Sequence, residues 1–404
     1  MRFTHSLAFA AAGIIAVSGT ALAEDTITLG SAVSLTGKYS TNGEHTQRGY
    51  DLAVDKINEA GGIKVGDKTY KLEIKYYDDE STPARGAELA ERLVKQDGIE
   101  LILGPYGSGL TKAVAPVTEE LKVPMVEANG ASRSLFTNGW KYIFATLSTS
   151  EQYLASAITL AAENAEALGK KPEDIKVAVV VENDPFSADI RAGVLEDMDK
   201  YGMKLVIDDQ FPRDLNDMSA TLTKVKALKP DVLIVSGHSK GAATAIRQIS
   251  EQKVYVPILA MTHCDAADII GNFGASSEYT LCATQWAPSL AYKDDLFGSA
   301  SDYAKLFEDT YGYAPPYQAA ESSAAVQVFA DALERAGSAD PQPVRDALAA
   351  TDMETFYGKI KFDETGKNIA KPMALYQVLD GEFKIVAPSD VAETKAVIPR
   401  PAMN

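Results

Sequence analysis

The stretch LILGPYGSGL, residues 101–110, joins an apolar run typical of a buried strand to an amphipathic segment that continues to Leu121. A strand, a glycine-containing turn and a helix in this order are typical of the α/β fold class. The turn points free backbone N–H groups and the positive helix end at whatever lies above, and Ser108 can add a hydroxyl donor. The stretch therefore predicts a site for an anionic group, a carboxylate. The alternative is a tight turn in which Ser108 only caps the helix.

The same unit recurs along the chain. Short β-branched runs alternate with helical segments, which predicts strands joined by crossover helices into parallel sheets. We expect strands at residues 26–33, 72–77, 101–103, 123–126, 142–146, 177–181, 204–207, 232–235, 257–261, 357–362 and 374–378. Two consecutive series of matching length predict two similar lobes.

The order of these elements predicts the domain organisation. Lobe 1 is expected to comprise residues 24–144 plus 285–355, and lobe 2 residues 145–284 plus 356–404. The late helical segments cannot bury their apolar faces alone, so we expect them to return and cover lobe 1. The chain would then cross between the lobes near residues 145, 284 and 356. Three crossings predict a multi-strand hinge between the lobes.

The first residues predict export. Arg2 and His5 precede an apolar run from Leu7 to Val17, and Ala21-Leu22-Ala23 follows it. This pattern is typical of a secretory signal peptide, residues 1–23, cleaved after Ala23. The alternative is an uncleaved anchor helix, but the run is shorter than the roughly 20 residues that span a bilayer. We therefore expect a mature periplasmic protein that is not embedded in the membrane.

Composition narrows the partners. The net charge of −17 argues against nucleic acid and anionic lipid surfaces, because both require clustered Lys and Arg. Cys264 and Cys282 are the two cysteines of the chain, and an oxidising compartment allows them to form a disulfide or to remain separate buried thiols. With four histidines, one of them in the signal peptide, the sequence spells out no metal cluster.

Five short motifs follow one another in order: Ser34-Leu35-Thr36-Gly37, Ile57-Asn58-Glu59-Ala60-Gly61-Gly62-Ile63, Tyr77-Asp78-Asp79, Leu103-Gly104-Pro105-Tyr106-Gly107-Ser108 and Phe362-Asp363-Glu364-Thr365-Gly366. In this order after a signal peptide, they resemble the periplasmic solute-binding proteins of ABC transporters, in the leucine/isoleucine/valine-binding family. The resemblance covers essentially the whole mature chain. It implies the type I periplasmic binding fold, in which two Rossmann-like lobes with a ligand cleft between them close on the ligand like a hinge.

The resemblance implies ligand contacts in loops at the carboxyl ends of strands. Ser108 occupies the position where family members hydrogen-bond the ligand carboxylate, and Phe186 matches a position that presents an aromatic ring. The family's threonine position aligns with Ala131, so a hydroxyl there comes from Ser132 or is absent. The predicted ligand-binding residues are Tyr39, Asn42, Tyr106, Gly107, Ser108, Asn129, Ala131, Ser132, Phe186, His238, Thr262 and Trp286.

One position departs from the family pattern. The amino-acid binders carry a glutamate that pairs with the ligand ammonium, and here that position is Thr262. A neutral threonine cannot balance a buried ammonium. Either another acid such as Glu182 or Asp184 substitutes, or the ligand is not an α-amino acid. Trp286 is expected either to offer a flat wall to a planar ligand or to pack in the hinge.

The rival interpretation is a serine hydrolase. Gly237-His238-Ser239-Lys240-Gly241 matches the pattern of a nucleophile elbow between a strand and a helix. The only histidine after Ser239 is His263, with Glu251 the only acid between them, and both lie too close in the chain for the usual partners. The match is more simply a turn that needs small residues.

The sequence therefore predicts a binding protein and not an enzyme. We expect an extracytoplasmic, monomeric component of an ABC importer that captures a small carboxylate-bearing ligand, an amino acid or a related or aromatic acid. Closure would bury the ligand, and the closed form would be recognised by the permease in the inner membrane. No cofactor is expected. A receptor's sensing domain shares this fold but would need a membrane span or signalling module.

Overall fold

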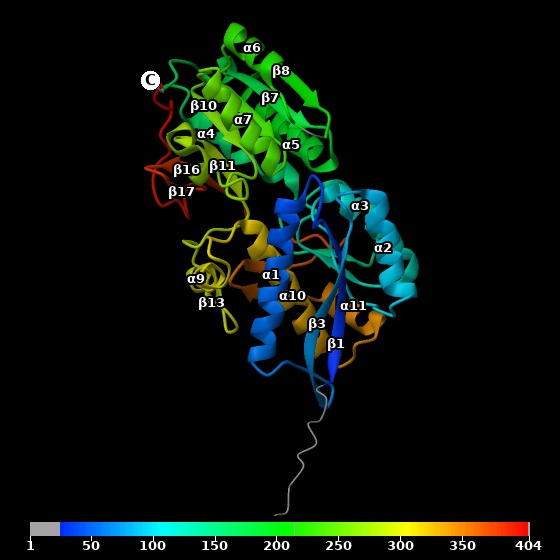
Figure 1. Ribbon diagram of the computed structural model, residues 1–404. Coiled ribbons are helices and arrows are strands. Elements are labelled where there is room, and N and C mark those ends of the chain that lie inside the picture. Colours follow the sequence, from blue (N-terminus) through cyan, green and yellow to red (C-terminus); the bar gives the residue numbers. More distant parts are fainter. Residues whose placement is uncertain (1–24, 214, 403–404) are drawn as a thin grey trace, which may run out of the picture.

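Two separate sheets form the centres of two lobes in the computed structural model, which describes residues 25–213 and 215–402 (Figure 1). The predicted signal peptide, residues 1–23, lies outside the described residues. Within the described part, no helix combines the length and the apolar character needed to cross a membrane.

The first lobe has a six-stranded sheet in the order β2-β3-β1-β4-β5-β6, parallel except for β2. Helices α1 and α10 pack against each other on one face, and α2 and α3 pair on the other. The strands are β1 (Thr26–Val33), β2 (Ile63–Val65), β3 (Lys68–Asp78), β4 (Ile102–Leu103), β5 (Met125–Glu127) and β6 (Ile143–Ala145). The helices are α1 (Ser40–Glu59), α2 (Pro83–Lys95), α3 (Ser108–Leu121), α9 (Ala300–Tyr311), α10 (Tyr317–Ala336) and α11 (Pro341–Ala349).

The second lobe has a seven-stranded sheet in the order β17-β16-β11-β10-β9-β7-β8. Its first five strands in sequence are parallel, and β16 and β17 add an antiparallel edge. The strands are β7 (Lys176–Glu182), β8 (Lys204–Phe211), β9 (Val232–Ser236), β10 (Ile258–Met261), β11 (Leu281–Thr284), β16 (Ala374–Leu379) and β17 (Glu382–Ala387). The helices are α4 (Ala155–Glu163), α5 (Pro185–Tyr201), α6 (Ser219–Leu228), α7 (Ser239–Glu251) and α8 (Ile269–Phe273). Two parallel α/β lobes are the predicted fold class.

The third crossing lies later than the sequence suggested. We expected it near residue 356, but β15 (Gly358–Lys361) pairs with β14 (Asp352–Thr355) in a separate small sheet. Lys367 then forms a parallel bridge with Ala145 at the edge of the first sheet. The chain reaches the second sheet only at β16, so residues 356–368 extend lobe 1 and not lobe 2. The sequence could not predict this, because the pairing of Lys367 with β6 is a backbone contact that leaves no periodic pattern of apolar residues.

Hydrogen bonds and close packing explain three of the sequence motifs. Ser34 Oγ donates to Asp79 Oδ1, at 2.6 Å, and the N–H groups of Leu35 and Thr36 donate to Asp78 Oδ1. The turn after β1 is thus fastened to the end of β3. In the late motif, Gly366 has φ +84° and lies so close to β6 that a Cβ would be 1.9 Å from a backbone oxygen.

The three crossing segments are joined by buried hydrogen bonds. Gln285 Nε2 donates to the carbonyl of Ser148, and the N–H of Ser148 donates back to Gln285 Oε1. Lys371 Nζ donates to the carbonyl of Gln285 at 2.6 Å, and Ser148 Oγ donates to the carbonyl of Lys371. Because each segment bonds to the other two, the hinge behaves as one unit between the lobes.

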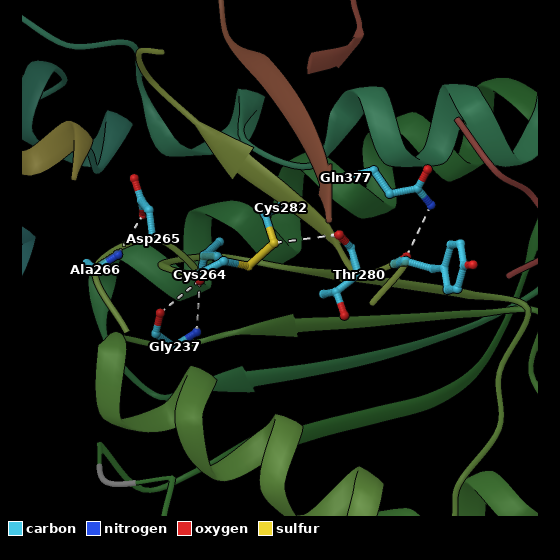
Figure 2. The surroundings of a disulfide bond; sticks show 9 residues. Gly237, Cys264, Asp265, Ala266, Thr280, Cys282 and Gln377 are labelled. Atoms are coloured by element: carbon cyan, nitrogen blue, oxygen red, sulfur yellow. Dashed lines mark hydrogen bonds between the residues drawn. A yellow bond between two sulfur atoms is a disulfide. The ribbon is translucent and has the colours of Figure 1, made fainter. Parts of the chain in front are cut away.

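A disulfide joins Cys264 to Cys282, the first of the two alternatives that the sequence left open. Cys264 lies in the loop after β10, and Cys282 lies in β11, the next strand of the same sheet. Figure 2 shows the bridge between this loop and the strand. The cross-link stays within the second lobe and leaves the hinge free to move.

Removing this bridge should lower stability. The cysteines are separated by 18 residues, and closing a loop of that size contributes about 3 kcal/mol to the free energy of unfolding. We expect Cys264→Ala, Cys282→Ala and the double variant to lose the same amount in denaturant titrations, because each change removes the one bridge. Losses that add in the double variant would contradict the pairing, as would two free thiols in mass spectrometry of the unreduced protein.

Candidate functional site

A small cavity lies between the two lobes. Its volume of about 10 Å³ is room for roughly one water molecule. The residues that line it are Tyr106, Gly107, Asn129, Tyr153, Phe186, His238, His263, Tyr317, Gln318 and Glu321. Six of these residues follow strands β4, β5, β7, β9 and β10: Tyr106, Gly107, Asn129, Phe186, His238 and His263. They lie at the carboxyl ends of parallel strands, where open α/β sheets bind ligands. A ligand larger than water therefore has to separate or shift the lobes.

Four helices begin at this cavity. The N-cap residues are Gly107 for α3, Asp184 for α5, His238 for α7 and Pro316 for α10. No N-cap side chain bonds to the first N–H groups of α3 or α7, so these groups remain available, whereas the first N–H of α10, from Tyr317, donates to Asp265 Oδ2. Four positive helix ends in one place favour negative charge in the cleft.

Gly107 gives α3 its approach to the cavity. Its φ of +85° is one that side chains with a Cβ rarely adopt, and the nearest side-chain atom that a Cβ would meet is 3.9 Å away, on His238. The glycine is therefore required by the backbone conformation and not by lack of space. This conformation turns the start of α3 toward the second lobe.

Tyr106 connects the two lobes at the centre of the cleft. Its hydroxyl lies 2.8 Å from His238 Nδ1 and 2.9 Å from His263 Nε2, and His238 Nε2 lies 3.1 Å from Asp184 Oδ2. Burial lowers the pKa of His263 well below its usual value, so this ring is neutral. Burial alone would raise the pKa of Asp184, but His238 and the Ser187 N–H hold it below its usual value.

Further contacts hold the lobes together around the cavity. Ser239 Oγ at the start of α7 donates to Asn42 Oδ1 of α1, at 2.9 Å. The N–H of Tyr317 donates to Asp265 Oδ2, at 3.1 Å. On the outer side, Arg133 and Glu196 form an exposed ion pair. The arrangement is therefore a closed cleft, with hydrogen bonds on each side of the cavity.

One group of side chains has the composition of a metal site. Potential ligand atoms of Glu182, Asp184 and His238 lie within 4.8 Å of one another. However, Lys38 Nζ pairs with Glu182 Oε2 at 2.9 Å, and Asp184 bonds to His238. The positive charge that this group requires is already supplied by Lys38, so we interpret it as an ion-paired contact between the lobes.

A buried carboxyl lies on the lobe 1 side of the cavity. Glu321 is 1% exposed, and its Oε2 accepts a hydrogen bond from the Tyr357 hydroxyl. Burial, and then the nearby carboxyl of Glu127, raises the pKa of Glu321 well above its usual value. Burial also lowers the pKa of the hinge residue Lys371 to about 7. Both groups therefore lose much of their charge in this conformation.

The family model described as "Periplasmic binding protein" matches residues 26–382, almost the whole of the described chain. The chain belongs to the periplasmic binding protein family. It is thus a binding protein and not an enzyme.

Named relatives agree with this membership. Leu/Ile/Val-binding protein homolog 8 of Brucella suis biovar 1 (strain 1330) is 26% identical over 98% of this chain and 99% of its own length. A leucine-binding protein of Thermotoga maritima MSB8 has a TM-score of 0.77 at 23% identity and covers 90% of this chain and all of its own. A solute-binding protein of Rhodopseudomonas palustris BisB5, solved with 3,4-dihydroxybenzoic acid, has a TM-score of 0.77 at 22% identity over 93% of this chain and 99% of its own. The two structures show that the fold is shared.

In this periplasmic binding protein, five of the predicted residues line the cavity: Tyr106, Gly107, Asn129, Phe186 and His238. Tyr39 and Asn42 lie beside it, where the Tyr39 ring meets His238 at 4.6 Å between centroids. Ser108 is the next residue in the chain after Gly107, and its Oγ accepts a hydrogen bond from the N–H of Ser132 at 2.9 Å.

Four predicted residues do not line the cavity. Thr262 Oγ1 donates to the carbonyl of Gly237 and so fastens the ends of β9 and β10. Trp286 packs in the hinge, where its Nε1 donates to the carbonyl of Phe356 at 3.0 Å, and it offers no wall to the cleft. Ala131 is buried, and Ser132 Oγ bonds to Asp189 of the second lobe.

Five cavity residues were missing from the predicted set: Tyr153, His263, Tyr317, Gln318 and Glu321. His263 directly follows a predicted position and could have been found from its place after a strand. The three α10 residues carried no such signal, because their place depends on the late chain returning to lobe 1.

The geometry around Ser239 does not suit a nucleophile. Its hydroxyl donates to Asn42 Oδ1, and among the described residues no histidine ring is hydrogen-bonded to it. His263 instead bonds to Tyr106, and Glu251 lies at the opposite end of α7. The hydrolase interpretation is therefore left without a general base.

Removing the Tyr106 hydroxyl should shift the protein toward an open form. Tyr106→Phe deletes two hydrogen bonds between the lobes, worth about 1 kcal/mol each, so the ratio of closed to open molecules falls roughly thirtyfold. Small-angle scattering should show a larger radius of gyration. Tyr142→Phe is the control, because that hydroxyl bonds to Gln342 within lobe 1. Equal scattering curves for the two variants would contradict this role of Tyr106.

Proposed function

We propose that this protein is the extracytoplasmic solute-binding component of an ABC importer. It captures a small carboxylate-bearing ligand between its lobes and presents the closed form to the membrane permease. Relatives named as Leu/Ile/Val-binding protein homologs and structural neighbours named as solute-binding proteins of ABC transporters support this role. We further propose that the mature protein is periplasmic, begins at Glu24 and acts as a monomer.

The observation that carries the proposal is the start of α3 in an enclosed cleft. The first N–H groups of α3, the hydroxyl of Ser108 and the conformation of Gly107 form a site for a carboxylate. Ser108 Oγ accepts the N–H of Ser132, which leaves its own hydrogen to donate. The second lobe supplies aromatic and imidazole rings, from Phe186, His238 and His263, that can cover the rest of the ligand.

A thermal-shift screen of the mature protein tests the ligand class. Amino acids, aromatic carboxylates and small amides are the probes, and we expect stabilisation by carboxylates and not by the amides. Scattering with the strongest ligand should then show that it keeps the lobes closed. A protein stabilised only by uncharged ligands would contradict the proposal.

The variant Ser108→Ala tests the carboxylate site directly. A hydrogen bond to a charged group contributes about 1.5–3 kcal/mol, so affinity should fall roughly ten- to a hundredfold in calorimetry. The matched control is Ser219→Ala, because Ser219 is also the first residue of a helix, α6, but lies away from the cleft. Unchanged affinity in Ser108→Ala would remove the assignment, and hydrolysis that depends on Ser239 would overturn the proposed function itself.

A further inference from the structure

Three side chains that line the cavity carry polar atoms without hydrogen-bond partners: Asn129, Gln318 and His263, of which His263 lacks a partner at Nδ1. Asn129 is 7% exposed and Gln318 is 1% exposed. Asn129 Nδ2 donates to Ser322 Oγ at 2.9 Å, which leaves its Oδ1 without a donor. Both Oε1 and Nε2 of Gln318 lack partners. Buried polar atoms are normally hydrogen-bonded, so these atoms indicate groups of a ligand.

The acids around the cleft differ in how they are compensated. Glu182 pairs with Lys38, and Asp184 accepts bonds from His238 and from the Ser187 N–H. Among the residues that line the cavity, Glu321 carries the only carboxyl group. It receives one hydrogen bond, from the neutral hydroxyl of Tyr357.

These three acceptors belong to one surface. Gln318 and Glu321 are three residues apart in the first turns of α10, so they lie on the same face of the helix. Asn129 follows β5 and is tied to α10 by its bond to Ser322. The cavity therefore has a polar wall on lobe 1, opposite Phe186 and His238 of lobe 2.

We propose that Asn129 Oδ1, Gln318 Oε1 and the Glu321 carboxylate form a subsite for a primary ammonium group of the ligand. An ammonium carries three donors and one positive charge, which matches three acceptors of which one is an acid. Gln318 Nε2 remains to donate to the ligand carboxylate. The inference rests on the proposed carboxylate site, and together the two sites bind a zwitterion.

The subsite supplies the negative charge that Thr262 cannot. The Thr262 hydroxyl is hydrogen-bonded to Gly237, and the acids that could have replaced it, Glu182 and Asp184, are already paired. Glu321 is thus a specificity-determining residue on a helix of lobe 1, whereas the family's acid follows a strand of lobe 2.

A purely structural role for Glu321 would be to balance Lys371. The ammonium of Lys371 lies 4.3 Å from the centre of the Tyr357 ring and donates to the carbonyl of Gln285, and it forms no ion pair with Glu321 among the described residues. The other titratable groups that affect or face Glu321 are Glu127, Asp265 and the tyrosines Tyr50, Tyr106, Tyr153, Tyr317 and Tyr357. Burial and the carboxyls of Glu127 and Asp265 raise its pKa, whereas the hydrogen bond from Tyr357 and the charge of Lys371 lower it.

The two roles differ in proton release. With a raised pKa, Glu321 holds a proton in the free protein at pH values above the usual range of a carboxyl. A bound ammonium lowers that pKa, so binding expels the proton, and affinity for an ammonium ligand rises with pH until Glu321 is ionised in the free protein. A ligand without the ammonium releases no proton from this group.

Calorimetry with matched ligands tests the subsite. The probes are leucine, 2-hydroxy-4-methylpentanoate and 4-methylpentanoate, with phenylalanine, 3-phenyllactate and 3-phenylpropanoate as a second series. In each series the ammonium is replaced first by a neutral hydroxyl and then by hydrogen. Titrations in two buffers of different ionisation enthalpy measure proton release. We expect the ammonium member to bind most tightly in at least one series and to release a proton.

In Glu321→Gln, the affinity for the ammonium ligand should fall roughly a hundredfold, and its proton release should disappear. Affinity for the corresponding acid without the ammonium should change less than about threefold, because the carboxylate site is intact. Glu182→Gln is the comparison, because loss of the Lys38 pair should weaken all ligands equally. Thermal melting confirms that each variant is folded.

The outcomes separate the two proposals. Equal affinity of Glu321→Gln and the unmodified protein for the ammonium ligand overturns the subsite and leaves the carboxylate site standing. Tighter binding of the acid without the ammonium to the unmodified protein does the same. An equal loss for ligands with and without the ammonium assigns Glu321 to the structural role. A protein that binds none of the six carboxylates contradicts the carboxylate proposal, and the subsite with it.

Discussion

The buried bonds among the three crossing segments are the constraint on which the cleft depends. Gln285 holds Ser148 through both ends of its amide, and Lys371 reaches across to the carbonyl of Gln285. Burial lowers the pKa of Lys371 to about 7, which shows how strongly this ammonium is desolvated. Because the three segments are tied together, they form one hinge about which the lobes rotate, and closure brings the start of α10 against lobe 2.

Acidic side chains lie close to the positive ends of helices in the cleft. The N-termini of α3, α5, α7 and α10 converge on a region that also contains Asp184 and Glu321. Positive helix ends stabilise nearby negative charge, so carboxyl groups can be buried here at a lower cost than elsewhere in a core. Lobe 1 contributes most of the polar groups and lobe 2 most of the imidazoles. A ligand bridging them meets a polar wall on lobe 1 and a ring-lined wall on lobe 2.

The sequence predicted the fold class and those cavity residues that lie in loops directly after strands. Tyr106, Asn129, Phe186 and His238 were found because each comes directly after a run with strand periodicity. Gln318 and Glu321 were missed because their position depends on α10 packing against α1, nearly three hundred residues earlier in the chain. Trp286 was ambiguous for a related reason, since no local pattern distinguishes a ring that packs in the hinge from a ring that faces a ligand.

The interlaced chain path also determines when the protein can fold. The first sheet of lobe 1 is formed early in the chain, but one face of α1 stays uncovered until α10 has been made. In the same way, the edge of β6 is unpaired until Lys367 has been made. Lobe 2 in turn needs β16 and β17 to complete its sheet. As the chain grows from its N-terminus, neither lobe is finished before nearly all of it has been made. A chain that ends before α10 therefore lacks one wall of the cleft, however well its first sheet has formed.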